Sequence, residues 1–468
     1  MKHAPTLFRV AGFCVAFVVP ALGVAPRRAR ANEAFPNSLG LLLPPDRPDE
    51  IILAATFGIV LSEDAGQTWT YTCEHLGNFG MTIGQYQLGA VPRDRLFALT
   101  DKSFLYSDDR SCTWASAQGM VTGKPLFDYF PDPGNPDRVW AARGPDLPDA
   151  GTNQAYSILE STDGGATFGT VRYTAAVGDT INGVEIARSD GNTAYLTMRG
   201  VQTLIPKLAV TQDGGASWTI RDLSARFGNA SLRIIAIDPS NAGKIFLRVT
   251  TTGANPMDAI AVSLDGGASF VTPNPLSVPD GVLTSFVRMP SGTLLVGGIK
   301  VVTNVIYRST NGGVSFQELP SPTVRGLAQR AGRAYVATDN EMGIDGYALG
   351  VSDDEGTSWQ PLMSYDQIQA ISACARSICQ SDCVLKANFG TWDESVCTAD
   401  PSPQPVDGGA RDGATMTDAR ADAGAVSPPG AGCGCRAGLA RHDGPAAGLA
   451  SLLLAVLLAR RRARRPAR

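Results

Sequence analysis

The sequence predicts an all-β fold: a seven-bladed β-propeller with four-stranded antiparallel blades, followed by a small cysteine-rich cap. Three observations support this fold class. An octapeptide rich in hydroxyl side chains, aspartate and glycine occurs seven times, at intervals of 43 to 54 residues. Short apolar segments bounded by turn residues precede each copy. No long amphipathic helical pattern occurs between residues 32 and 370.

The octapeptide has the pattern Ser/Thr-x-Asp-x-Gly-x-Ser/Thr-Trp/Phe, as in SEDAGQTW at residues 62–69. Ser111 replaces the glycine in the second copy, and Asn311 replaces the aspartate in the sixth. The acidic position is held by Asp64, Asp109, Asp163, Asp213, Asp265, Asn311 and Asp354, and the final ring by Trp69, Trp114, Phe168, Trp218, Phe270, Phe316 and Trp359.

A unit of roughly 40–50 residues that repeats seven times indicates a propeller or a solenoid. The first unit shows four short strand-like segments, LGLLL (39–43), IILAAT (51–56), IVLS (59–62) and TWTY (68–71). Four strands per unit favour a propeller, because a closed ring of such sheets leaves only short edges. A right-handed β-helix is the alternative, although its coils are usually shorter. The propeller is predicted to span residues 32–370.

The chemistry of the octapeptide predicts a tight turn between the third and fourth strands of each blade. Hydroxyl and carboxylate oxygens accept local backbone N–H groups, and glycine adopts the positive φ that such turns require. The terminal Trp or Phe is expected to bury its ring between sheets. We therefore interpret the aspartates as scaffold rather than as paired catalytic carboxylates.

These seven octapeptides resemble the turns of the Asp-box (BNR-repeat) propellers, a superfamily that includes sialidases, xyloglucanases, sortilin-type receptor domains and photosystem II assembly factors. The resemblance covers residues 32–370 and implies that the turns lie at the blade periphery, away from the central ligand-binding face. It implies the fold but no activity, because one scaffold hosts many functions.

Both ends of the chain are predicted to be targeting segments. Residues 1–31 contain Lys2 and Arg9, an apolar stretch and a small-x-small sequence at 29–31, which is typical of a secretory signal peptide. An amino-terminal membrane helix is the alternative. Residues 398–432 are rich in Ala, Asp, Pro and Gly and are expected to form a disordered linker.

Residues 433–468 contain Cys433 and Cys435, a short apolar stretch and an arginine cluster. This order resembles the myxobacterial carboxy-terminal sorting signal (MYXO-CTERM). The resemblance implies export, processing near the two cysteines and display on the outer cell surface, with membrane contact only through this segment. The alternative is a plain tail anchor, whose arginines would remain cytoplasmic.

Charge and histidine content narrow the possible functions. Residues 32–435 carry 27 basic and 43 acidic residues, a net charge of about −16, which argues against nucleic acid and anionic membranes as partners. His75 is the one histidine between the two targeting segments, so a multi-histidine metal site is excluded there. We expect His75 to be a surface or packing residue, and we expect no metal, no cofactor and a monomer.

Six cysteines remain once Cys14 and the sorting-signal pair are set aside. They are Cys73, Cys112, Cys374, Cys379, Cys383 and Cys397. In an exported chain they predict three disulfides. Neighbouring blades should bring Cys73 and Cys112 together, so we predict that pair. The other four, with C-x4-C-x3-C-x13-C spacing, form a disulfide-rich cap over residues 371–397 whose pairing the sequence leaves open. A tetrathiolate zinc knot is the alternative.

Two functions fit the sequence. The first is a non-catalytic surface module that binds a protein, a peptide or a glycan through the central face and loops. The second is an extracellular glycoside hydrolase, sialidase-like or xyloglucanase-like, which needs two acids facing each other in a cleft. The sequence contains no Arg-Ile-Pro segment near its start, no phosphate loop and no His-Glu-x-x-His motif. It identifies no catalytic residue.

Overall fold

The structure of the protein, a computed structural model, describes residues 37–77, 85–93, 95–100, 103–145, 155–251, 256–340 and 345–401. All of these residues belong to one compact unit. The predicted signal peptide, almost all of the predicted linker, and the sorting signal with Cys433 and Cys435 lie outside the described residues. Within the described residues, no helix is both long and apolar enough to span a membrane.

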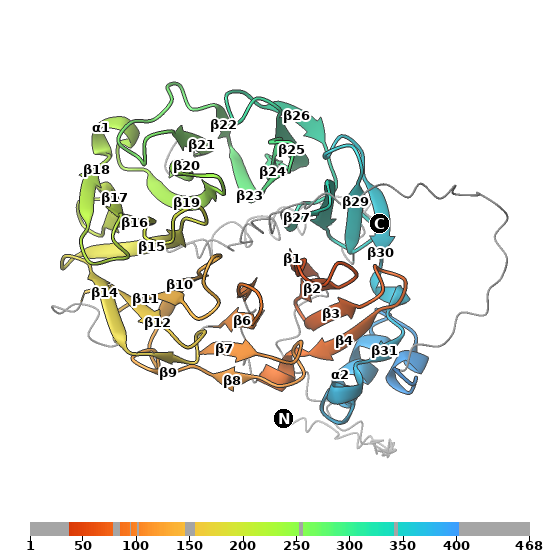
Figure 1. Cartoon of the computed structure of the whole chain (residues 1–468). Coiled ribbons are helices and arrows are strands. Elements are labelled where there is room, and N and C mark those ends of the chain that lie inside the picture. Colours follow the sequence, from red (N-terminus) through yellow and green to blue (C-terminus); the bar gives the residue numbers. More distant parts are fainter. Residues whose placement is uncertain are drawn as a thin grey trace, which may run out of the picture. The chain divides into compact units, whose positions relative to one another are not determined.

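Seven antiparallel sheets form a ring, which confirms the predicted seven-bladed propeller (Figure 1). Each sheet takes four strands from one continuous stretch of chain, and their order in the sheet follows their order in the sequence. The first strand of each blade lies nearest the centre of the ring. Strand boundaries follow the expected segments within one or two residues; for example, the segment expected at 68–71 is a strand at Thr70–Cys73.

The strands of blades 1 to 4 are as follows. Blade 1 contains β1 (Ser38–Leu42), β2 (Ile51–Ala55), β3 (Gly58–Ser62) and β4 (Thr70–Cys73); blade 2 contains β5 (Gln85–Leu88), β6 (Leu96–Leu99), β7 (Phe104–Ser107) and β8 (Ala115–Ser116); blade 3 contains β10 (Leu126–Pro131), β11 (Val139–Arg143), β12 (Ser157–Ser161) and β14 (Thr170–Thr174); blade 4 contains β15 (Asp179–Ile186), β16 (Ala194–Gly200), β17 (Pro206–Thr211) and β18 (Thr219–Asp222).

The strands of blades 5 to 7 complete the ring. Blade 5 contains β19 (Ser231–Asp238), β20 (Asn241–Thr251), β21 (Met257–Ser263) and β22 (Leu276–Pro279); blade 6 contains β23 (Gly281–Arg288), β24 (Leu294–Lys300), β25 (Thr303–Ser309) and β26 (Gln317–Pro320); blade 7 contains β27 (Gly326–Arg330), β28 (Arg333–Ala337), β29 (Leu349–Ser352) and β30 (Gln360–Met363).

The remaining elements are short. A parallel pair, β9 (Gln118–Gly119) and β13 (Thr167–Phe168), links blades 2 and 3. The helices are η1 (Glu74–Gly77), α1 (Ser224–Phe227), η2 (Tyr365–Gln367), η3 (Ala373–Ala375), α2 (Arg376–Asn388) and η4 (Glu394–Cys397), and the last strand is β31 (Ala370–Ile371).

The hydrophobic core lies between blades. The largest cluster joins blade 1 to blade 7 and the cap, through side chains such as Leu53, Tyr71, Leu349 and Trp392. Other clusters join blades 2 and 3, 3 and 4, 4 and 5, 5 and 6, and 6 and 7. Each sheet therefore buries both faces, which explains why the strands are nearly continuous runs of apolar residues.

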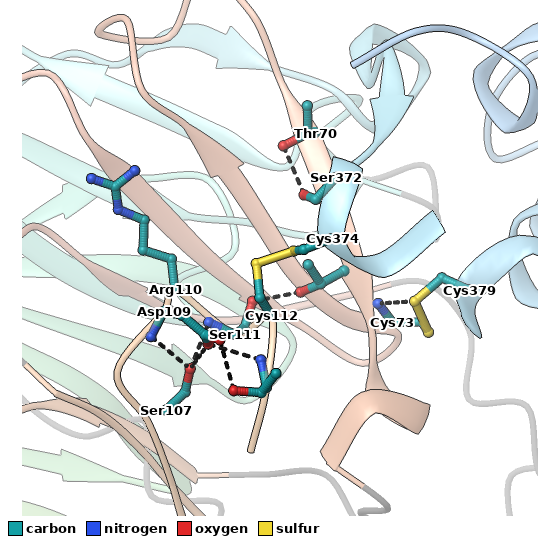
Figure 2. Close-up of a disulfide and its surroundings, with 12 residues drawn as sticks. Thr70, Cys73, Ser107, Asp109, Arg110, Ser111, Cys112, Ser372, Cys374 and Cys379 are labelled. Carbon is teal, nitrogen blue, oxygen red and sulfur yellow. Dashed lines mark hydrogen bonds between the residues drawn. A yellow bond between two sulfur atoms is a disulfide. The ribbon is translucent and has the colours of Figure 1, made fainter. Parts of the chain in front are cut away.

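The segment after blade 7 closes the ring. Strand β31 pairs in parallel with β4, which makes blade 1 a five-stranded sheet. The Ser372 amide donates to the Tyr71 carbonyl at 2.9 Å, and the hydroxyls of Ser372 and Thr70 are 3.0 Å apart (Figure 2).

Three disulfides form, but the predicted Cys73–Cys112 pair is wrong. Cys73 is bonded to Cys379, Cys112 to Cys374, and Cys383 to Cys397 (Figure 2 shows the first two). The physical reason is the position of the C-terminal segment. It lies against blades 1 and 2, so each blade cysteine meets a cap cysteine rather than its neighbour. The cap thus holds one internal disulfide and two that attach it to the ring, here called the clasp disulfides.

The first prediction concerns the clasp disulfides, Cys73–Cys379 and Cys112–Cys374. While one clasp disulfide remains intact, the other closes a loop of only roughly forty residues. Replacing the two cysteines of that second disulfide by serine should therefore lower the unfolding free energy by about 4 kcal/mol. Replacing both opens a loop of hundreds of residues, because the bonded cysteines are 306 and 262 residues apart. We expect the double replacement to cost more than the sum of the single ones, as measured from urea unfolding midpoints and slopes.

The matched control replaces Cys383 and Cys397, which are only 14 residues apart. The loss of unfolding free energy from that change should simply add to the loss from either clasp replacement. Strict additivity of the two clasp replacements would contradict a shared role in closing the ring.

Candidate functional site

All seven octapeptides lie between the third and fourth strands of their blades, where a common hydrogen-bond pattern fixes each turn. Blade 4 shows it clearly. The Thr211 hydroxyl donates to Asp213 Oδ1 at 2.7 Å and accepts the Gly215 amide at 2.9 Å. Asp213 Oδ1 also accepts the Ser217 amide at 2.8 Å, and Asp213 Oδ2 accepts the Ser217 hydroxyl at 2.5 Å. Both carboxylate oxygens are therefore occupied inside the turn.

Two successive residues in each turn have positive φ, which explains the glycines. In blade 4, Gly214 and Gly215 have φ of 70° and 87°. In blade 2 the same positions are Arg110 and Ser111, with φ of 57° and 71°. Ser111 has a compensating contact, because its hydroxyl is 2.6 Å from that of Thr72 in blade 1. Serine is less favourable than glycine at this positive φ, but its side chain forms a hydrogen bond between blades that glycine could not form.

These hydrogen bonds stabilise the charged form of the turn aspartates. Donation by the Ser217 side chain and amide lowers the pKa of Asp213 to about 2. The Ser269 hydroxyl likewise lowers the pKa of Asp265 to about 2. Asn311 keeps the geometry without the charge, since its oxygen accepts the Ser315 amide at 3.0 Å and its Nδ2 donates to the Ser315 hydroxyl at 2.8 Å.

The terminal rings are less uniformly buried than expected. Trp69 and Phe168 are fully buried, at 2% and 0% exposure. The other five rings, Trp114, Trp218, Phe270, Phe316 and Trp359, are only half-buried. Trp218 shows the usual placement: it contacts Trp140 and Tyr173 of the preceding blade. Trp218 thus lies at the edge of a junction between blades, whereas Trp69 and Phe168 belong to the core clusters.

A separate group of polar side chains lines a pocket on the inner strands of blades 4 to 6. The pocket lies among Glu185 of β15, Arg233 of β19, Arg248 of β20, and Thr284 and Ser285 of β23. All of these strands belong to the central part of the ring (Figure 1). None of these five residues was among the candidates from sequence. A signal was present, because each charged residue interrupts an otherwise apolar strand, as Glu185 does in GVEIA.

The two arginines are paired with buried aspartates that also connect blades. Arg233 Nη2 lies 3.2 Å from Asp128 Oδ1, and Asp128 Oδ2 accepts the Val184 amide at 3.0 Å. Asp128 thereby links blades 3, 4 and 5. Arg248 donates to Asp258 Oδ2 at 2.8 Å. Because Arg233 and Arg248 are direct cross-strand partners, their side chains lie side by side.

Glu185 differs from these paired charges. It is 7% exposed, and among the described residues no hydrogen bond holds its carboxylate. Burial raises the pKa of Glu185 to about 8, and the nearby Arg233 only partly opposes that effect. This shift favours the protonated form of Glu185, which offers both a donor and an acceptor to the pocket. The hydroxyl of Thr284, which lines the same pocket, is buried and has no hydrogen-bond partner within the described structure.

His75 lies far along the chain from this pocket, on η1, with its side chain 56% exposed. Its Nδ1 is 2.5 Å from Asp382 Oδ2 on α2. The structure therefore places His75 at the surface beside the cap, and the described residues provide no serine nucleophile hydrogen-bonded to it.

No protein-family model and no curated protein matches this chain. Among solved structures it is similar to a GH74 xyloglucanase from Xanthomonas campestris (15% identity, TM-score 0.35, 71% of this chain and 60% of that one). It is also similar to YCF48 from Cyanidioschyzon merolae (13%, 0.43, 64% and 92%) and to a Hadza microbial sialidase (13%, 0.38, 64% and 70%). The chain thus spans about 60% of the xyloglucanase, and these likenesses concern the fold alone.

The second prediction concerns acid stability. A carboxyl with a lowered pKa stabilises the fold above its ordinary value of 3.8, and this contribution disappears as the pH falls toward about 2. Asp213→Asn should retain the turn, as Asn311 does, but reduce proton uptake on acid unfolding by up to about one proton. Asn311→Asp should increase it. Urea unfolding midpoints measured between pH 5 and pH 2 test both variants. If the unfolding free energy of either variant changes with pH as steeply as that of the wild type, the role of the carboxylate is contradicted.

The third prediction concerns Glu185. A carboxyl whose pKa rises from 4.5 to about 8 on folding leaves stability intact below 4.5 and lowers it as the pH rises toward 8. Glu185→Gln should match the wild type near pH 4.5 and be more stable by up to roughly 4 kcal/mol at pH 8. Glu160→Gln is the control, because Glu160 is buried beside Arg172 and should lose stability instead. If the wild-type protein has the same unfolding free energy at pH 4.5 and pH 8, the raised pKa of Glu185 is disproved.

Proposed function

We propose that this chain is an exported Asp-box propeller that binds a glycan, a peptide or a protein through its inner face without chemically changing it. The observation that carries this proposal is the composition of the inner pocket. Of the described residues that line it, Glu185 is the one carboxylate, and its two arginines are already paired with aspartates. Such a site supplies directional hydrogen bonds rather than an acid–base pair.

The pocket suits a ligand that presents neutral hydroxyl or amide groups. With Glu185 uncharged, the charges of Arg233 and Arg248 are balanced by those of Asp128 and Asp258. The neutral acid and the unpartnered Thr284 hydroxyl then provide donors and acceptors with no strong net charge. Burial of both groups keeps competing water away, which strengthens each hydrogen bond.

One observation favours a second candidate, an extracellular glycoside hydrolase. A glutamic acid that stays protonated at neutral pH is what a glycosidase requires as general acid. Glu185 would then be that acid. A hydrolase also needs a second carboxylate to act as base or nucleophile. Asp128 is fully buried, and its two oxygens already accept from Arg233 and the Val184 amide, which makes it a poor second group.

We further propose that the chain acts outside the cell. The signal-like residues 1–31, the MYXO-CTERM-like residues 433–468 and the linker before them support an exported head that is tethered to the outer surface. The three disulfides agree with an oxidising location.

The fourth prediction tests binding against hydrolysis. The full chain, produced by an exporting host, is screened on a glycan and peptide array and with chromogenic glycosides. We expect saturable binding without turnover, and a loss of affinity of at least about tenfold in Thr284→Val or Arg248→Gln, because each removes a hydrogen bond at a buried site. Val302→Ser, at an exposed hairpin tip on blade 6, is the control and should bind as the wild type.

Turnover that Glu185→Gln abolishes would establish the hydrolase instead. Binding that none of the pocket variants weakens would show that the ligand uses another part of the propeller. Urea unfolding of each variant separates loss of the site from loss of the fold.

A further inference from the structure

Two side chains that can bind a metal ion lie beside the Cys73–Cys379 disulfide, which joins blade 1 to the cap. Cys73, His75 and Asp382 each direct a ligand atom to one small region, where these atoms lie within 4.8 Å of one another. Cys379 supplies a fourth, since it is bonded to Cys73. Within the described part of the chain, this is the one group of three or more potential metal ligands gathered so closely.

We propose that Cys73, Cys379, His75 and Asp382 form a zinc site when the two cysteines are thiols, so that either a metal ion or a disulfide can hold this clasp. Two thiolates, one imidazole and one carboxylate are a ligand set that zinc accepts in tetrahedral geometry. The inference is independent of the function proposed for the inner pocket.

The two sulfurs, bonded at 2.06 Å, would have to separate to roughly 3.8 Å once the disulfide is reduced, and the other ligand atoms would move less. Ligand distances of about 2.0–2.3 Å place neighbouring ligand atoms roughly 3.3–3.8 Å apart in a tetrahedral zinc site. His75 Nδ1 and Asp382 Oδ2 are 2.5 Å apart, so their separation would have to increase by about 1 Å for both atoms to ligate one zinc ion. The side chain of His75 is 56% exposed, which leaves it free to move and gives the ion a path from solvent.

The surroundings also support a thiolate. The Cys73 amide donates to the Cys379 sulfur at 3.0 Å (Figure 2). A backbone N–H directed at sulfur stabilises the charged form and orients it, as outer hydrogen bonds do around metal ligands. Cys73 and Cys379 are 3% and 0% exposed, so a metal bound there would be shielded from competing ligands.

The two states exchange by a balanced reaction. In the metal-bound state, both thiolates ligate Zn²⁺. A small-molecule disulfide oxidant accepts two electrons from them, its own S–S bond breaks, and its two sulfurs leave as thiols with two protons from water. The Cys73–Cys379 bond forms and Zn²⁺ is released, because a disulfide sulfur is no longer a thiolate ligand. Both states connect β4 and η1 to α2, so the cap remains attached in either.

The fifth prediction tests this site with zinc alone. The full chain is made under reducing conditions with its other seven cysteines replaced by serine: Cys14, Cys112, Cys374, Cys383, Cys397, Cys433 and Cys435. We expect one zinc per chain, measured with a chromophoric chelator, and tetrahedral ligand-field bands when Co²⁺ is substituted. His75→Gln and Asp382→Asn should each weaken zinc binding by on the order of a hundredfold, whereas Glu394→Gln, at an exposed cap position, should not.

Oxidised glutathione should then release one zinc for each disulfide formed. If the serine variant does not fold, the reduced wild-type chain serves, and His75→Gln should lower its zinc content by one equivalent. Equal binding by the His75 and Asp382 variants, or zinc that remains after disulfide formation, would overturn the proposal.

Discussion

Closure of the ring is the constraint on which the rest of this structure depends. Each blade here takes its four antiparallel strands from one continuous stretch of chain, so no antiparallel strand of blade 7 comes from the N-terminal part of the chain. The junction between blades 1 and 7 must then be held by packing and by whatever follows blade 7. The C-terminal segment performs that role with a parallel strand on β4, two disulfides, and the aromatic side chains of Tyr365 and Trp392, which share a core cluster with Tyr71 of β4. The largest core cluster lies at the closure point for the same reason.

The repeated turns help to hold neighbouring blades together around the rest of the ring. Within a blade they satisfy their own hydrogen bonds, and toward the previous blade they present carbonyl oxygens that arginines cap. Arg95 donates to the Gly164 carbonyl at 2.7 Å, and Arg308 donates to that of Glu355 at 3.1 Å. A local motif thereby sets the spacing between neighbouring sheets. This dual use explains why the motif repeats in every blade.

The sequence predicted the fold well because the information was local. The spacing of the octapeptides and the apolar strands predicted the number of blades and the placement of each turn. The cysteine pairing could not be obtained in this way, because Cys73 and Cys112 meet partners 306 and 262 residues away whose position depends on the closed ring. The inner pocket was missed for a related reason. Glu185, Arg233 and Thr284 come from three blades and are ordinary strand residues until the ring brings them together.

The inner strands also show what distinguishes a structural charge from a functional one. Asp128 and Asp258 are buried, but each accepts an arginine and the amide of a neighbouring blade, so their burial is compensated and serves assembly. Glu185 is also buried in this architecture but lacks such partners, and burial raises its pKa to about 8. An uncompensated buried acid lowers stability, and a glutamine or an apolar residue would fit an inner strand without that cost. The ligand proposed for the inner pocket would account for the presence of Glu185 by completing the hydrogen bonds that the fold leaves open.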